Sequence, residues 1–133
     1  MRVLFNELPR REKYPLPPRM ITEKVAETIG IKPQMEKANA MVPATWIAHF
    51  AFGAAAGFWY GLQKLDTKQA TIRDGIKFGM KVYAWNYAGT LPLAGLYPPP
   101  QSQPIERTAL MVIAHGVWGA TLGLLTKKLR LIL

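Results

Sequence analysis

The only two histidines in the chain, His49 and His115, occur in the same local pattern. The segment Ile47-Ala48-His49-x-x-x-Gly53-x-x-x-Gly57 recurs near the C-terminus as Ile113-Ala114-His115-x-x-x-Gly119-x-x-x-Gly123. Residues four apart lie on one face of an α-helix, so each histidine shares a face with its two glycines. Two imidazoles on separate helices are able to ligate a haem, relay a proton or bind a substrate.

Three interpretations of this histidine pair follow from the residues. The two imidazoles would hold a b-type haem, with the glycines making room for the ring, or they would form a proton-relay or substrate-binding pair. The simplest interpretation is that each imidazole hydrogen-bonds a neighbouring helix, at Asn86, Tyr87 or Thr90. The sequence therefore predicts no cofactor and no metal site, and it leaves open a haem b, a lipid or a pigment.

The glycines have a second interpretation that needs no ligand. Small residues at every fourth position let helix backbones approach closely in a bilayer, where lipid supplies no hydrophobic drive for association. We therefore predict helix-packing faces at Gly53, Gly57, Gly61, Gly119 and Gly123. Gly75-x-x-x-Gly79 adds a related pattern at the start of the second expected helix.

The distribution of charge predicts the helices that carry these motifs. The 17 basic and 8 acidic residues all avoid three windows, residues 38–63, 82–105 and 108–126. A bilayer core of about 30 Å requires about 20 helical residues, and a soluble helix of that length rarely lacks charge. We predict an all-α integral membrane protein with spans at about 43–62, 72–91 and 108–125. With no cysteine, disulfides and thiolate metal sites are excluded.

Residues 1–40 are predicted to form a basic, proline-containing peripheral arm. Tyr14-Pro15-Leu16-Pro17-Pro18 is expected to be extended, because proline fixes φ and disfavours helix at the residue before it. A short helix is expected at about 21–29, ended by Gly30, with Ile21, Val25 and Ile29 on one apolar stripe. That stripe would face a membrane surface, a partner or the chain's own loops. The arm lacks the interleaved aromatic residues of a single-strand binder, so nucleic acid is not an expected partner.

Two further expectations concern the path of the chain. The second span is expected to break at Leu91-Pro92 and to leave the membrane through the triple-proline loop. Basic residues cluster over 64–77 and 127–130, so the positive-inside rule predicts a cytoplasmic first loop and C-terminus. The arm and the proline loop would then face outward. The helical rise of about 1.5 Å per residue places both histidines about 9–11 Å inside the outward-facing half of the membrane.

An ordered series of motifs resembles a known family. Tyr14-Pro15-Leu16-Pro17-Pro18-Arg19-x-Ile21-Thr22-Glu23-Lys24-Val25, the helix of His49 and Gly53, Trp85-x-Tyr87-x-Gly89-x-Leu91-Pro92 and Ala114-His115-x-x-Trp118-Gly119-x-x-x-Gly123 are similar to the YagU-like group of bacterial inner-membrane proteins. The resemblance implies an inner-membrane location and no settled activity. Family members usually carry another membrane helix before the Pro-Leu-Pro-Pro motif, and residues 1–9 look like its trailing end. Either the start is truncated or a partner subunit supplies the missing packing surface.

These observations favour a non-enzymatic protein. The three charge-free windows contain no carboxylate, and no catalytic triad, metal motif or phosphate-binding glycine loop is recognisable. We expect a structural or accessory subunit of a larger membrane assembly, or a homo-oligomer, with the lipid bilayer and other membrane subunits as partners. A haem b electron-transfer subunit that uses His49 and His115 is the alternative. A small transporter or channel is the third possibility.

Overall fold

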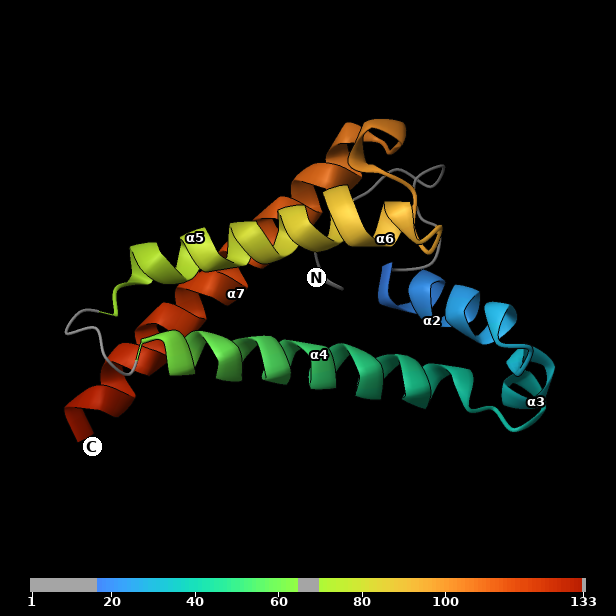
Figure 1. Ribbon diagram of the computed structural model, residues 1–133, viewed down its shortest axis with the longest axis horizontal. Helices are drawn as coiled ribbons and strands as arrows, with labels where there is room; N and C mark the ends of the chain where they lie inside the picture. Colours follow the sequence, from blue (N-terminus) through green and yellow to red (C-terminus); the bar gives the residue numbers. More distant parts are fainter. Residues whose placement is uncertain (1–16, 65–69, 133) are drawn as a thin grey trace.

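The structure is a computed structural model that describes residues 17–64 and 70–132, and over these residues every regular element is helical (Figure 1). The elements are α2 (Pro17–Thr28), α3 (Lys32–Lys37), α4 (Met41–Gln63), α5 (Ile72–Tyr83), the π-helix η2 (Ala84–Thr90), α6 (Leu91–Leu93), the 3-10 turn η3 (Pro100–Ser102) and α7 (Ile105–Ile132). The predicted all-α class is confirmed for the described part of the chain. Helices α4 and α7 run in the same direction, and α5 runs in the opposite one (Figure 1).

Two helices within the described residues, α4 and α7, are long and apolar enough to cross a membrane. The core helix of a soluble protein would be mostly buried, yet only 11% of the apolar window of α4 and 17% of that of α7 are buried within the chain. Their apolar side chains therefore face outward, as lipid-exposed helices require. The middle expected span falls on α5, η2 and α6, which do not form one long apolar helix.

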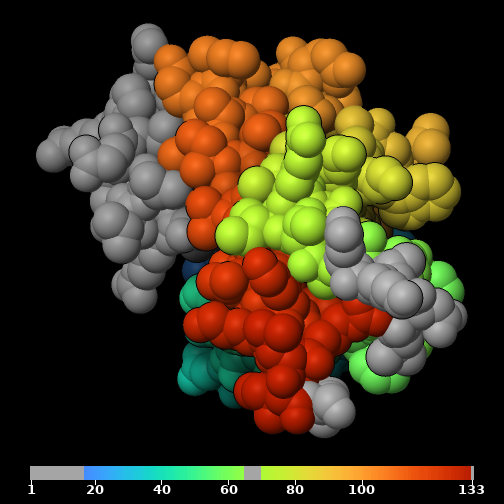
Figure 2. Space-filling model, turned by 90° about the vertical axis from the view of Figure 1, so that its left-hand side faces the viewer, coloured from blue at the N-terminus to red at the C-terminus, as the bar shows by residue number. Residues whose placement is uncertain are grey.

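The closest helix pair is α5 with α7, and glycines line the contact. Gly75, Gly79, Gly119 and Gly123 are all buried. A Cβ atom on Gly75 would collide with the backbone carbonyl of Gly119 and would stand 2.7 Å from the Gly123 nitrogen. Figure 2, which views the end of the molecule where α7 terminates, shows the start of α5 seated on α7. Only glycines at these positions let the two backbones come so close.

Helix α4 touches this pair near one end and diverges from it toward the other (Figure 1). Near the C-terminal end of α4, Tyr60 is 1% exposed, and its ring centroid lies 5.0 Å from that of Phe78 in α5. Phe78 in turn lies 6.1 Å from the ring of Trp118 in α7. An aromatic cluster at one end thus holds α4 to a pair that is itself packed through glycine.

The N-terminal arm agrees with one expectation and departs from another. Gly30 ends α2 as predicted: it has a φ of +78°, and the Ile31 N–H donates to the Ala26 carbonyl at 2.9 Å. The extended conformation predicted for Pro17-Pro18 is wrong, because α2 begins at Pro17; proline suits the first helical turn, where its missing N–H costs no hydrogen bond. The rest of that predicted stretch, residues 14–16, and the segment 1–9 lie outside the described residues. The short helix α3 was not anticipated.

The apolar stripe predicted for the arm helix is not the face that it buries. Helix α2 packs against α4, and Ala26 is 2% exposed, whereas Val25 is 38% and Ile29 61% exposed. A small residue allows close approach of one helix to another, so alanine rather than the larger aliphatic residues sits at the contact. The arm helix is therefore docked on the chain's own first long helix.

The helix ends at Leu93, one residue beyond Pro92, rather than at Leu91-Pro92 where the break was predicted. The π-helix η2 precedes the proline, and within it the Leu91 N–H donates to the Asn86 carbonyl, five residues back. In an α-helix Pro92 would leave the carbonyl four residues back without a donor, and its ring would clash there. The wider π turn accommodates the proline, so the helix passes Pro92 and ends with α6 at Leu93. In the turn that follows, Gly95 has a φ of +68°, and the Leu96 N–H donates to the Leu91 carbonyl at 2.9 Å.

Candidate functional site: the histidine cleft

A cleft of about 690 Å³ lies between α4 and the α5–α7 pair, and both histidines line it. His49 and Gly53 come from α4, and His115 comes from α7. The remaining walls are apolar and include Phe50, Phe52 and Trp118. Because α4 and α7 run in the same direction, the duplicated motif brings its two imidazoles into one cavity.

The environment of His115 defines its tautomer. Its Nδ1 atom lies 2.8 Å from the carbonyl oxygen of Met111 on the same helix. A carbonyl oxygen only accepts, so Nδ1 carries the proton, and in the neutral imidazole Nε2 holds a bare lone pair. The rings of Tyr83 and Tyr87 each contact His115 edge-on at 5.4 Å. These contacts hold the ring in place, and the tautomer makes Nε2 the nitrogen that could accept a hydrogen bond or ligate a metal.

The hydrogen bond to a neighbouring helix that the simplest interpretation expected is replaced by this bond within α7. Asn86, which was expected as a partner, donates its Nδ2 hydrogen to the Val82 carbonyl on its own helix at 2.9 Å. Polar side chains in these helices therefore bond backward along their own helix. The hydrogen bond of His115 uses Nδ1 and does not involve Nε2.

His49 is the more open member of the pair. Its ring lies 6.3 Å from that of Trp46 and 5.6 Å from that of Phe50, both on the same helix. One turn further along α4, no atom of the described residues lies within 4 Å of the position that a Cβ on Gly53 would occupy. The wall of the cleft beside His49 is therefore smooth backbone with free space in front of it.

The predicted glycine faces divide between the two copies of the repeat. Gly119 and Gly123 of the second copy lie against α5. In the first copy, a Cβ on Gly57 would stand 3.1 Å from Leu122 Cδ2 of α7, whereas Gly53 and Gly61 have open space. Gly119, one turn from His115, thus packs against α5, whereas Gly53, one turn from His49, contacts no neighbouring helix. Identical spacing in the sequence leads to two different environments.

A second groove, of about 1210 Å³, lies on another side of α4. It separates α4 from α5, η2 and α6, and Phe52, Trp59 and Trp85 are among its lining residues. Phe52 lines both the groove and the histidine cleft. Helix α4 is therefore flanked by open space on two sides along its diverging part.

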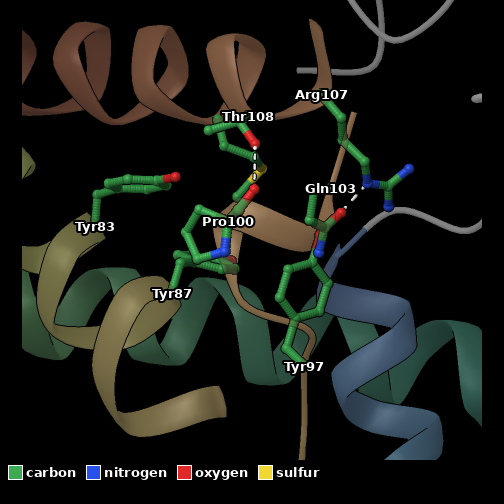
Figure 3. Close-up of a pocket in the computed structure, with 8 residues that line it drawn as sticks. Tyr83, Tyr87, Tyr97, Pro100, Gln103, Arg107 and Thr108 are labelled. Atoms are coloured by element: carbon green, nitrogen blue, oxygen red, sulfur yellow. Dashed lines mark hydrogen bonds between the residues drawn. The ribbon is translucent and has the colours of Figure 1, made fainter. Parts of the chain in front are cut away.

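Sequence reasoning missed a polar cluster at the start of α7 (Figure 3). Arg107 is 3% exposed, although a lone charge beside an apolar span is typical of a membrane-flanking surface residue. Its Nε donates to the Tyr97 hydroxyl at 3.4 Å, and its Nη2 lies 3.5 Å from Met20 Sδ in α2. A neighbouring cavity of about 10 Å³, with Tyr83 and Tyr87 on its wall, has room for about one water molecule. The available signal was a lone arginine between two charge-free windows, following a loop that contains Tyr97.

The donor atoms of the cleft limit what it can bind. Among residues 17–64 and 70–132, no group of three or more His, Cys, Asp or Glu side chains is placed to hold a metal ion. Two imidazoles alone do not complete a tetrahedral or octahedral protein site. The arrangement instead fits a ligand that brings its own donor atoms or that fills the cavity by apolar contact.

Comparisons with known proteins place the chain at the level of a family. No curated protein and no solved structure matches it. A match to a family of proteins of unknown function extends over residues 6–124, which includes both histidine–glycine motifs, the π-helix and the triple-proline loop. Because the match covers most of the chain, this protein belongs to the DUF1440 family.

Proposed function

We propose that this protein is a non-enzymatic structural or accessory subunit of the membrane, which acts in a homo-oligomer or a larger membrane assembly. Within the DUF1440 family we assign it to the YagU-like group, as a multi-pass protein of a bacterial inner membrane. The helix that would join it to its neighbours is α4. The segment 72–93 would be a third, shorter crossing, with Lys77 and Lys81 extending toward the membrane surface.

The observation that carries this proposal is the contrast between the two copies of the glycine repeat. The stripe on α7 is filled by α5, so the pair is a complete packing unit. The stripe on α4 has open space at Gly53 and Gly61, and a groove or cleft lies on two sides of the helix. A glycine face in a membrane stabilises close helix contact only when another helix occupies it. A helix from another subunit would complete α4 at Gly61, outside the cleft that Gly53 lines.

The position of the basic residues supports a defined orientation for this subunit. The end of α4, the start of α5 and the end of α7 lie at the same end of the molecule (Figure 1). Lys64 Nζ there lies 3.9 Å from Asp74 Oδ2. The basic residues at this end are Lys64, Arg73, Lys77, Lys127, Lys128 and Arg130. By the positive-inside rule this end would face the cytoplasm, together with the C-terminus.

The assembly is tested by comparing Gly61→Leu with Ala51→Leu. Gly61 lies on the open glycine stripe, whereas Ala51 is exposed on α4 but off the stripe and outside both cavities. Protein solubilised in a mild detergent is analysed by native mass spectrometry and by light scattering, with thermal unfolding as a check of the fold. We expect Gly61→Leu to lower the mass of the complex at unchanged thermal stability and Ala51→Leu to leave it unchanged.

Two outcomes would contradict the proposal. A wild-type protein that remains a single chain with no co-purifying subunit would show that α4 needs no partner. A complex whose mass is the same in Gly61→Leu as in the wild type would show that the assembly does not use this face.

A further inference from the structure

We propose that the cleft between α4 and α7 binds an iron porphyrin such as haem b, with His49 and His115 as its two axial ligands. This inference goes beyond the role of the protein as a membrane subunit, since that role requires no ligand. It rests on the coordination chemistry of the two imidazoles, the size and lining of the cleft and the exposure of His49.

The coordination chemistry favours a metal that already has most of its ligands. The Nδ1 proton of His115 is engaged by the Met111 carbonyl, which leaves the Nε2 lone pair for a metal. Hydrogen bonding at the far nitrogen of a ligating histidine is the usual way in which ring orientation is set in metal sites. Over the described residues, the lining of the cleft includes two imidazoles and no carboxylate, and the chain has no cysteine to supply a thiolate. A porphyrin contributes four nitrogens in a plane, and two axial imidazoles complete six-coordinate iron.

The size and the lining of the cleft suit a largely apolar molecule of the size of a porphyrin. Its volume of about 690 Å³ lies within the range of about 300–1,000 Å³ that is typical of ligand sites. Gly53 leaves free space one turn from His49, where a larger side chain would obstruct a ring that is bound edge-on to the helix. Phe50, Phe52 and Trp118 provide aromatic walls, and none of the described residues that line the cleft is charged.

The exposure of His49 supplies a third reason. His49 is exposed within the chain, and it lies in the middle part of an apolar helix that is long enough to cross a membrane. An imidazole that faces lipid is costly, and polar residues within membrane helices accordingly mark functional sites. Ligation of a metal would give the free nitrogen of His49 a partner that no described residue is seen to provide.

The test uses the full chain, purified in a mild detergent, and its absorption spectrum. We expect either a haem that co-purifies or, for haem-free protein, a six-coordinate low-spin spectrum on titration with ferric haem that saturates at one haem per chain. The Soret band should shift to longer wavelength when dithionite reduces the iron. Metal-free protoporphyrin IX serves as the control ligand, because it has the shape of the ring but no iron to ligate, and it should bind at least ten-fold more weakly.

Two sets of variants assign the site. His49→Ala and His115→Ala should each remove the low-spin spectrum, and the circular dichroism of the haem-free variants checks that they fold. Gly53→Leu should block binding while leaving both histidines in place, because its side chain projects into the cleft. Ala51→Leu adds the same bulk to the same helix outside the cleft and should bind as the wild type does.

The proposal is overturned by any of three results. These are the absence of a low-spin complex at saturating ferric haem, equal binding of metal-free protoporphyrin, and retention of the low-spin spectrum by either histidine variant. These results concern haem binding alone. The proposed subunit role is tested separately, by the mass of the complex. Conversely, a single-chain protein that binds haem would refute the assembly and support the site.

Discussion

Gly79 of α5 lies directly against the backbone carbonyl of His115 in α7. A Cβ atom on Gly79 would collide with that carbonyl oxygen and would stand 3.2 Å from the Gly119 Cα. The turn of α7 that carries His115 therefore packs against the glycine face of α5, and His115 is also one of the residues that line the cleft toward α4. The close approach of α5 and the position of the histidine depend on the same contact.

Replacing Gly79 with alanine should weaken this contact. The added methyl group meets rigid backbone rather than the end of a side chain, and such overpacking costs about 1–3 kcal/mol, which exceeds the gain of about 1 kcal/mol from better helix propensity. The unfolding temperature in detergent, followed by circular dichroism, should fall. Gly116→Ala is the matched control, because its Cβ would stand 3.8 Å from the flexible Met80 Cε. That variant should be as stable as the wild type or more so; equal stability of both variants would show that α5 and α7 are further apart.

The start of α5 is held by a capping box that also touches α7. The Asp74 N–H donates to Thr71 Oγ1 at 3.1 Å, and the Thr71 N–H donates to Asp74 Oδ2 at 3.2 Å. A Cβ on Gly123 of α7 would collide with the Thr71 carbonyl, so this cap sits on the helix contact. Thr71→Ala should destabilise the protein by about 1 kcal/mol, the usual cost of losing an N-cap. Denaturant unfolding in detergent measures this cost, and Thr71→Ser, which retains the hydroxyl, should recover most of the loss.

The hydroxyl of Tyr97 links the proline loop to the buried Arg107. It accepts from Arg107 Nε at 3.4 Å and lies 3.5 Å from Gln103 Oε1. Both contacts are long, so Tyr97→Phe should cost only about 0.5–1 kcal/mol of unfolding free energy. Gln101→Ala, an exposed change in the same loop, should cost less than Tyr97→Phe. A larger loss in the Gln101 variant would show that the hydroxyl of Tyr97 does not anchor the loop.

Membrane orientation is tested with single cysteines, because the chain has none of its own. Gln101→Cys lies in the exposed proline loop, and Lys128→Cys lies at the basic end of α7. By the positive-inside rule, a membrane-impermeant thiol reagent applied to intact cells should label position 101 and spare position 128. Both positions should react once the cells are lysed. Labelling of position 128 alone in intact cells would reverse the proposed topology.

The sequence by itself was sufficient for the helices and for some of their ends. Charge-free windows located α4 and α7, because a long helix without charge has no face for water. Gly30 marked the end of α2, because glycine is favoured where the backbone is left-handed. The histidine–glycine repeat was also visible as spacing alone. These features are local: they depend on residues within a few turns of one another.

Tertiary structure decided which face of each helix meets which neighbour. The two copies of the repeat have the same spacing, yet Gly119 contacts α5 and Gly53 faces an open cleft. Arg107 had the pattern of a surface charge in the sequence, but the proline loop and α2 cover it. The π-helix before Pro92 likewise lets the helix pass the proline, so that it ends at Leu93 rather than at Leu91-Pro92. Spacing along one helix defines a face, but the partner of that face depends on where segments distant in sequence pack, and that is set by the arrangement of the whole chain.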